Sequence, residues 1–386
     1  MQYRTLGRTG LSVSEIGFGG EWISPNDPEH GKALVQRCHE LGINIVDCWM
    51  ADPQIRTNLG EALDGQRKDW IIQGHIGSTW QNGQYMRTRE ESACRAAWED
   101  LKTRLKTNYI ELGMIHYVDS VTDWAECTDV NGGYYQFVQE LLQRGEIGHV
   151  GLSTHNPEIA RLAIESGWIE MIMFSLNPAF DMLPASEDIN AMFAEEYDAN
   201  LGGIDKTRAE LYQLAEEAGV GITVMKPFAG GRLLDAARSP FGVALSPIQC
   251  IHYCLTRPGV ASVMCGYSTV EQIEEAVAYE KSTPEERDYA TMLANAPAHS
   301  YKGQCTYCGH CAPCPSGIDI AAVNKLYDLA TLHDEVPASV QDHYGQMAAN
   351  ADDCIACGEC ETRCPFDVPV AMRMADARKL FDRQGV

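Results

Sequence analysis

Short runs rich in apolar residues alternate with segments of helical periodicity along roughly the first 280 residues of the chain. Runs such as Ile43–Asp47 and Ile147–Leu152 are typical of strands that are buried on both faces. Segments such as Glu29–Leu41 and Thr88–Leu105 place apolar residues three and four positions apart, which predicts amphipathic helices. The strand–helix alternation occurs eight times, so the sequence predicts an α/β fold, a (β/α)8 TIM barrel.

Three further observations bear on the predicted architecture. A doubly wound sheet also alternates strands with helices, but it seldom reaches eight repeats, and no Gly-x-Gly-x-x-Gly follows the first strand. Before the barrel, Gln2–Leu6 and Leu11–Val13 flank a glycine-containing turn, which predicts a small hairpin. Segment Met182–Gly203 is an insertion after the sixth strand, and both a lid over the barrel mouth and a plain surface loop remain open.

The pattern changes after Ala294. Residues 295–299 resemble a linker, and two cysteine runs follow, with helical periodicity over Ile318–Leu332 and Ser339–Ala349 between them. We therefore divide the chain into a barrel over residues 1–294 and a small α-helical ferredoxin-like domain over residues 295–386.

Each cysteine run carries Cys-x-x-Cys-Gly-x-Cys and closes with Cys-Pro. Three closely spaced thiolates can surround one face of an iron–sulfur cubane, and the cysteine before proline ligates the other cluster. The sequence therefore predicts two 4Fe–4S clusters, although the spacing before the last cysteine of the first run is one residue short. A zinc site is the weaker alternative, because a tetrahedral ion takes four ligands. The first predicted ligand set is Cys305, Cys308, Cys311 and Cys364, and the second is Cys354, Cys357, Cys360 and Cys314.

Composition and charge indicate the expected location of the protein and the partners that it is not expected to bind. The formal net charge of −24 repels phosphate backbones, so we expect no nucleic-acid partner. No apolar run approaches the ~18 residues of a membrane span. Of the 15 cysteines, those outside the two runs show no pairing pattern, and no signal peptide opens the chain. We therefore expect free thiols and a cytoplasmic location.

Polar side chains end four consecutive predicted strands. Asp47, His75, His116 and His155 end the second to the fifth strand, and such ends converge at the mouth of a barrel, where active sites are built. Two chemistries fit this set: acid–base catalysis by imidazoles, which titrate near neutrality, or binding of a divalent metal. We favour acid–base catalysis, with Asp47, His75 and His116 as the catalytic residues.

Several segments, taken in their order along the chain, resemble the aldo/keto reductase superfamily, and the cysteine-rich domain resembles that of its iron–sulfur branch. The resemblance implies a catalytic tetrad of Asp, Tyr, Lys and His, a carbonyl or hydroxy substrate, and an NAD(P) cofactor. The segments that carry it are Gly42–Asp47, Tyr109–His116, Gly148–Ser153, Val224–Gly231 and Cys265–Gln272.

Within the tetrad, Asp47 matches the family's Asp and His116 its His. The position expected for the Tyr, shortly after Asp47, offers Asp52 and no tyrosine, and His75 occupies the slot of the Lys. Imidazole changes between its neutral and cationic forms near neutral pH, so His75 and His116 would then supply the proton that the family's Tyr provides.

The nicotinamide pocket implied by the resemblance is also altered. Ser153 matches the family's serine, whereas Met173 and Met225 stand where the family has a glutamine and a stacking aromatic residue. The loop after the eighth strand lacks a basic residue for a 2′-phosphate. Whether a nicotinamide cofactor binds is left open, and the sequence supports NADP less than it supports NAD. The residues expected to hold a cofactor or another anion are Ser153, Lys226, Gly266 and Gln272.

These features together predict an iron–sulfur oxidoreductase that acts on a small polar carbonyl or hydroxy compound at the barrel mouth. Because a cubane passes single electrons and hydride transfer moves two, the expected partner is a one-electron carrier such as a ferredoxin. Two alternatives stay open. One is a lyase, epimerase or isomerase that uses the Asp47–His75–His116 set beside structural clusters, and the other is a non-catalytic electron carrier with the barrel as a scaffold.

Overall fold

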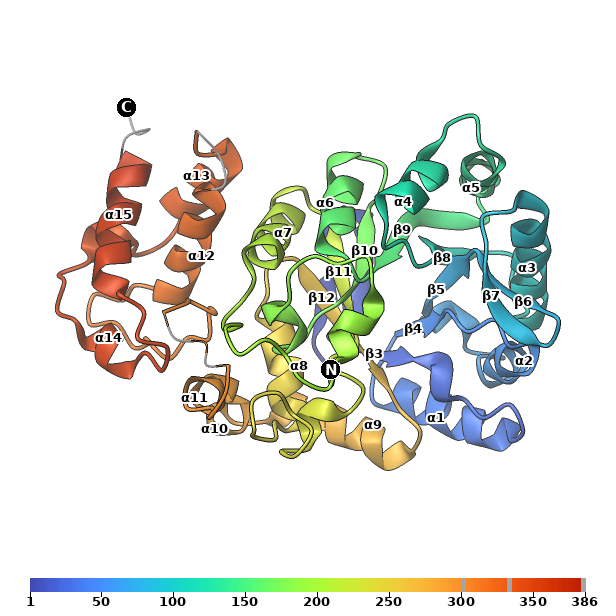
Figure 1. The fold of residues 1–386 in the computed structure, drawn as a ribbon, viewed down its shortest axis with the longest axis horizontal. Coiled ribbons are helices and arrows are strands. Elements are labelled where there is room, and N and C mark those ends of the chain that lie inside the picture. The colour runs from blue at the N-terminus through green and yellow to red at the C-terminus, as the bar shows by residue number, and fades with distance from the viewer. Residues whose placement is uncertain (300, 302, 332–334, 383–386) are drawn as a thin grey trace.

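The computed structural model describes residues 1–386 apart from residues 300, 302, 332–334 and 383–386. Eight parallel strands close into a barrel in the order β10–β11–β12–β3–β4–β5–β8–β9 (Figure 1). The predicted (β/α)8 architecture is confirmed. The strands are β3 (Ile16–Gly19), β4 (Ile45–Cys48), β5 (Ile71–Ile76), β8 (Ile110–Ile115), β9 (Ile147–Thr154), β10 (Met171–Ser175), β11 (Gly221–Met225) and β12 (Val260–Gly266).

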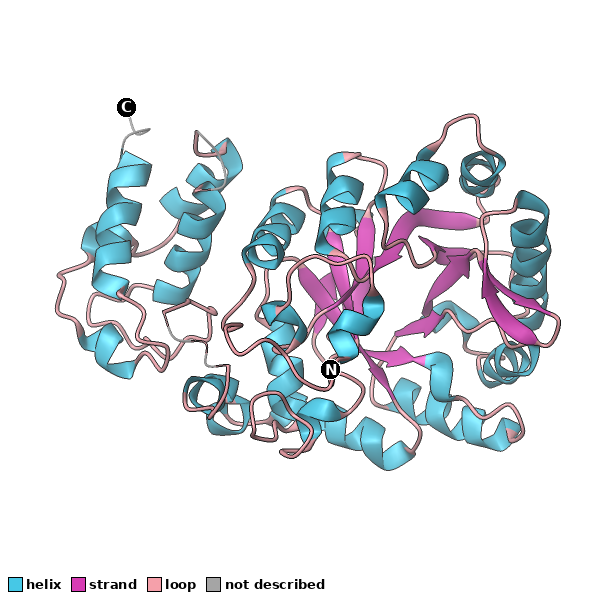
Figure 2. Cartoon of the chain, in the orientation of Figure 1, coloured by secondary structure: helices cyan, strands magenta, loops and turns pink. Residues whose placement is uncertain are grey.

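Helices surround the barrel wall (Figure 2). Their starts follow local sequence signals: the Asp27 carboxylate accepts hydrogen bonds from the first-turn N–H groups of α1, and Pro28 opens that helix. Each helix buries an apolar stripe against the strands, as α1 does with Leu34, Val35 and Cys38. The helices are α1 (Pro28–Glu40), α2 (Pro53–Ala62), α3 (Glu91–Arg104), α4 (Val121–Thr128), α5 (Gly133–Gln143), α6 (Pro157–Glu165), α7 (Lys206–Glu217), α8 (Pro247–Leu255) and α9 (Val270–Val277).

The barrel interior is a packed core. The predicted N-terminal hairpin, β1 (Tyr3–Thr5) with β2 (Ser12–Ser14), forms and contributes two buried side chains to this core. Five of the interior residues are methionines, whose unbranched and flexible side chains fill irregular space. The interior cluster comprises Leu6, Val13, Ile45, Leu112, Met114, Met171, Met173, Met225, Ala261 and Met264.

A second antiparallel hairpin follows β5 and was not predicted from the sequence. It pairs β6 (Ser78–Gln81) with β7 (Gln84–Arg87). Its turn, Asn82-Gly83, has both residues at positive φ (52° and 78°), as a two-residue type I′ turn requires. The next helix, α3, therefore begins at Glu91 rather than at Thr88, because the Glu90 carboxylate caps it.

The cysteine-rich part of the chain is helical, and it packs beside α7 and α8 (Figure 1). Its described residues contain no strand, in agreement with the predicted α-helical module; Leu332, the predicted end of one helix, lies outside them. Gln213 of α7 donates to the Tyr307 hydroxyl at 2.6 Å, and Arg257, just after α8, donates to the Thr306 carbonyl. Two short helices, α10 (Pro284–Arg287) and α11 (Tyr289–Ala294), precede this part, and its own helices are α12 (Ile320–Ala330), α13 (Ala338–Gly345), α14 (Glu359–Arg363) and α15 (Val370–Asp382).

Candidate active site

A cavity of about 550 Å³ lies at the carboxyl ends of the barrel strands. The insertion after β10 forms part of its wall through Ile189 and buries Met192, so this insertion is not a remote surface loop. The cavity brings together all the catalytic and cofactor-binding residues that were predicted in the barrel. They are Asp47, His75, His116, Ser153, Lys226, Gly266 and Gln272.

Four side chains form one line of hydrogen bonds from the barrel core to the cavity. Asp47 Oδ1 lies 2.8 Å from His75 Nε2, and His75 Nδ1 lies 2.8 Å from His116 Nδ1. His116 Nε2 lies 2.7 Å from the hydroxyl of Tyr85. Asp47, His75 and His116 are only 1%, 3% and 4% exposed, so water does not compete for these contacts. We call this line Asp47–His75–His116–Tyr85 the proton relay.

The hydrogen-bond pattern assigns the protons of the relay. Burial and the neighbouring His75 hold the pKa of His116 well below its usual range, so this imidazole is neutral. Burial raises the pKa of Tyr85 to about 12, so the phenol keeps its proton. The Tyr85 O–H then donates to His116 Nε2, the His116 Nδ1–H to His75 Nδ1, and the His75 Nε2–H to the Asp47 carboxylate. Each donor has an acceptor.

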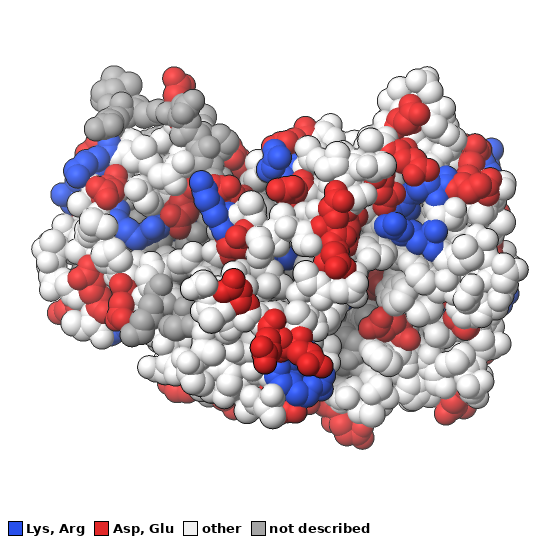
Figure 3. Space-filling view, viewed as in Figure 1, with Lys and Arg blue, Asp and Glu red and all other residues white. Residues whose placement is uncertain are grey.

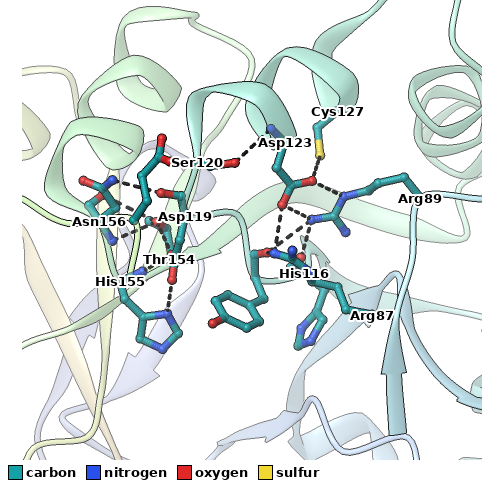
Figure 4. Close-up of polar contacts among 12 residues, drawn as sticks. Arg87, Arg89, His116, Asp119, Ser120, Asp123, Cys127, Thr154, His155 and Asn156 are labelled. Atoms are coloured by element: carbon teal, nitrogen blue, oxygen red, sulfur yellow. Dashed lines mark hydrogen bonds and ion pairs between the residues drawn. The ribbon is translucent and has the colours of Figure 1, made fainter. Parts of the chain in front are cut away.

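The second hairpin carries Tyr85 to the relay, and two arginines fasten this hairpin to the end of β8 (Figure 4). Arg89 donates to the His116 carbonyl at 2.6 Å and to the Asp123 carboxylate at 2.9 Å. Arg87 donates to the Tyr117 carbonyl at 2.6 Å. Guanidinium groups paired with a partly buried carboxylate in this way hold a fixed geometry. The Tyr85 hydroxyl is therefore held at a defined position.

The structure adds a tyrosine that the sequence interpretation of the tetrad did not find. Asp52, in the slot expected for the Tyr, caps α2 by accepting hydrogen bonds from Gln54 N and Ile55 N. The phenol comes instead from Tyr85, on a different loop. Asn-Gly between alternating segments is the strongest short-range signal for a hairpin, so the Asn82-Gly83 pair could have indicated this element.

His155 does not join the relay. Its Nδ1 lies 2.9 Å from Asp119 Oδ2, its backbone N–H donates to the same carboxylate at 2.7 Å, and its Nε2 lies 3.3 Å from Lys226 Nζ (Figure 4 shows the Asp119 contact). Every ring nitrogen of His75, His116 and His155 thus has a protein partner. Among the described residues, no three or more His, Cys, Asp or Glu side chains are grouped for one metal ion. The hydrogen bonds favour acid–base chemistry over the metal-binding alternative.

The side chains in the expected nicotinamide positions offer poor contacts. Met173 meets the amide of Gln73 through its sulfur at 3.4 Å, and Met225 presents a thioether chain where a ring would stack. Gly266 lies under Trp22, whose Nε1 would be only 2.8 Å from a Cβ at this position. Ser153 lines the cavity as expected. The contacts that would orient a nicotinamide ring are therefore largely missing.

The eight cysteines of the two runs surround two separate hollows. Each hollow is otherwise lined mainly by apolar side chains, such as Phe366 at the first and Met374 at the second. Four thiol groups around one hollow is the donor set of a 4Fe–4S cluster, so the residues fit that group. Cys314 lies with the second set despite its short spacing. The first hollow has Cys305, Cys308, Cys311 and Cys364, and the second has Cys314, Cys354, Cys357 and Cys360.

Comparison with known proteins agrees with this architecture. The aldo/keto reductase family model matches residues 15–244, and a 4Fe-4S dicluster domain model matches residues 304–369. The uncharacterized oxidoreductase YqkF of Bacillus subtilis (strain 168) is 28% identical over 295 residues, which is 72% of this chain and 90% of that protein. The L-galactose dehydrogenase of Arabidopsis thaliana is 22% identical, over 72% of this chain and 88% of that protein.

A solved structure gives the same result for the barrel. The aldo-keto reductase AKR11C1 from Bacillus halodurans, in its holo form, superimposes with a TM-score of 0.58 and 25% identity, over 74% of this chain and 94% of that one. This chain belongs to the aldo/keto reductase family, and it is an oxidoreductase with a C-terminal 4Fe–4S dicluster domain. The structure shows no helix long and apolar enough to span a membrane among the residues it describes.

Proposed function

We propose that this enzyme interconverts a small polar carbonyl compound and its alcohol in the barrel cavity. The proton relay is the observation that carries the proposal. It begins at a buried carboxylate, ends at a phenol in the wall of the cavity, and joins the two through hydrogen bonds of 2.7–2.8 Å. General acid catalysis requires such a donor within hydrogen-bond reach of the reacting oxygen.

The relay can hold one additional proton without losing a hydrogen bond. In that state His75 is an imidazolium ion that donates to both Asp47 and His116, and the Asp47 carboxylate balances its charge. His116 then donates to the Tyr85 oxygen, which frees the Tyr85 proton for a carbonyl oxygen in the cavity. Reduction of the carbonyl to the alcohol takes two electrons and two protons. The relay delivers one proton to the oxygen, which leaves His75 neutral, and the second proton, which adds to carbon, is taken up from solvent water. Oxidation of the alcohol runs the same transfers in reverse.

The two cysteine sets are proposed to hold the two 4Fe–4S clusters, with the ligands assigned from the sequence. Such clusters supply single electrons when bound. A one-electron carrier such as a ferredoxin would therefore be the partner, rather than a nicotinamide, whose contacts the cavity largely lacks. The seven cysteines outside the two runs are free thiols, which suit a reducing cytoplasm. The domain boundary near residue 294 stays a prediction.

Continuous contacts join the first cysteine run to the cavity. The Tyr289 hydroxyl donates to the carbonyl of Thr306, between two cysteines, at 3.1 Å, and its ring lies edge-on to Tyr253. The Tyr253 hydroxyl donates to the Asp181 carboxylate at 2.7 Å. Two hydrogen bonds complete the connection to the cavity wall. The whole path follows Thr306, Tyr289, Tyr253, Asp181, Asn177 and Lys226.

A dye-linked assay tests the proposal. Iron-loaded enzyme is mixed anaerobically with reduced viologen and a panel of small carbonyl compounds, with and without NAD or NADP. We expect consumption of two viologen electrons per alcohol formed, at a rate that neither nucleotide changes. Product formation without viologen oxidation would contradict the proposal and support the lyase, epimerase or isomerase alternative. An absolute requirement for NAD or NADP would contradict the proposed electron donor.

A further inference from the structure

Lys226 is a partly buried lysine that forms no ion pair with the residues that the structure describes. It directly follows β11, and of the described residues that line the cavity it is the one lysine or arginine. Its single side-chain hydrogen bond is to His155 Nε2, at 3.3 Å. No carboxylate among the described residues forms an ion pair with it. An ammonium group withdrawn from water is costly unless its charge and its N–H groups are matched, so an anion bound in the cavity would complete its contacts.

The backbone holds Lys226 in an unusual conformation. Its φ is +60°, in the left-handed region that residues with a Cβ rarely adopt. The Asn177 side-chain amide donates to the Lys226 carbonyl at 2.9 Å, and the Ala229 N–H donates to it at 3.0 Å. A strained residue fixed in this manner is typical of functional sites.

A second set of side chains orients the ammonium group. The Asp119 carboxylate accepts the His155 Nδ1–H, so the other ring nitrogen carries the lone pair that accepts from Lys226. An ammonium group has three N–H donors, and this contact uses one. Lys226 lines the cavity, so its remaining donors are available to a ligand bound there. Burial lowers the pKa of Lys226, and the carboxylates of Glu21, Asp119 and Asp47 oppose this shift.

We propose that Lys226 binds the carboxylate of the substrate, which is a small monocarboxylic acid bearing the carbonyl or hydroxyl group that Tyr85 meets. This inference rests on the proposed function and names its substrate class. One lysine supplies one positive charge, which matches a monoanion better than a pyrophosphate. Ser153, which is buried in the same wall, is a further polar group near the strand ends.

Binding of matched ligands tests the carboxylate site without turnover. Isothermal titration of the full chain is carried out with 2-oxobutanoate and with its methyl ester. Lys226→Met is compared with the charge-preserving Lys226→Arg and with Lys206→Met, whose lysine is exposed on α7. Loss of a charge-assisted contact should weaken binding of the acid about 10- to 100-fold. Lys226→Met should leave binding of the ester unchanged, Lys226→Arg should retain most of the affinity for the acid, and Lys206→Met should match the wild type.

The outcomes separate this inference from the proposed function. Equal weakening of the acid and the ester, or no weakening of either, would overturn the carboxylate site. A parallel titration with NAD and inorganic pyrophosphate tests the other possible source of the anion. If Lys226→Met weakens binding of these two ligands and leaves binding of the acid unchanged, the site belongs to a nucleotide and the inference is wrong. Viologen-linked turnover of neutral ketones with no preference for acids would refute the inference alone. Charge-dependent binding of the acid without turnover of any carbonyl would refute the proposed function and leave the carboxylate site standing.

Discussion

Replacement of Tyr85 by phenylalanine tests the relay most directly. The change removes the hydroxyl that donates to His116 Nε2 at 2.7 Å, and it keeps the ring that lies edge-on against Trp49 at 5.5 Å. The buried acceptor on His116 then has no donor, which should cost ~1–3 kcal/mol of unfolding free energy. Loss of the general acid should lower kcat ~10²- to 10⁴-fold, equivalent to about 3–5 kcal/mol at 1.36 kcal/mol per decade.

The two magnitudes need separate measurements. Unfolding by denaturant gives the stability change, and the initial rate of viologen oxidation at saturating carbonyl gives kcat. We expect KM to change little, because the cavity retains its shape. Tyr109→Phe is the matched control: its ring is 42% exposed and it lies next to the start of β8, at the end of the strand away from the cavity. A folded Tyr85→Phe variant with kcat within about threefold of the wild type would refute the relay, since general acid catalysis contributes ~10²-fold or more.

Four further predictions follow from the same contacts. Asp47→Asn keeps a hydrogen-bond acceptor but cannot balance an imidazolium ion, so kcat in the viologen assay should fall ~10²-fold or more, with iron content unchanged. Burial and nearby arginines lower the pKa of His252 to about 4, below its ordinary 6.5, so the folded state resists protonation. The unfolding free energy should thus decline as the pH drops from about 6.5 toward about 4, and His252→Gln should flatten that decline in denaturant titrations. Arg257→Met removes the hydrogen bond to the Thr306 carbonyl in the first cysteine run, and should speed hydrogen exchange over residues 304–314; unchanged exchange would contradict its role at this contact. Cys364→Ser should lose about half of the bound iron, whereas Cys127→Ser should retain all of it.

The overall charge of the protein gives little indication of where the site lies. Acidic side chains outnumber basic ones on the face shown in Figure 3, in line with the net charge of −24. An overall negative field would not by itself attract an anionic substrate. Lys226 is the one lysine or arginine among the described residues that line the cavity, and it acts over a short range in a region of low dielectric, where one charge has a stronger effect than many charges at the solvated surface.

Much of the fold was predictable because it repeats. The alternation of buried strands and amphipathic helices is a periodic signal, and eight repeats leave few architectures other than the barrel. Since the strands of such a barrel are parallel, their carboxyl ends meet at one mouth. Asp47, His75 and His116 could therefore be expected near one another from their places at strand ends, and the structure brings them into direct contact.

The hairpin that supplies Tyr85 shows what this reasoning lacks. Its two strands are short, and only the Asn82-Gly83 pair marks its turn. Its placement depends on Arg87 and Arg89 reaching residues that follow β8, contacts between segments about 30 residues apart. Periodicity along the chain contains no information about such pairings.

The sequence alone therefore determined the barrel, the helical cysteine module and the strand-end residues, because each depends on local pattern and spacing. Tertiary structure decided which of these residues act together. It brought His75 into hydrogen-bond contact with His116 and not with His155, it placed the Tyr85 hydroxyl at His116, and it set Lys226 beside His155 in the cavity wall. The physical reason is that hydrogen bonds extend only about 3 Å, so their partners are known only once distant segments have been packed together.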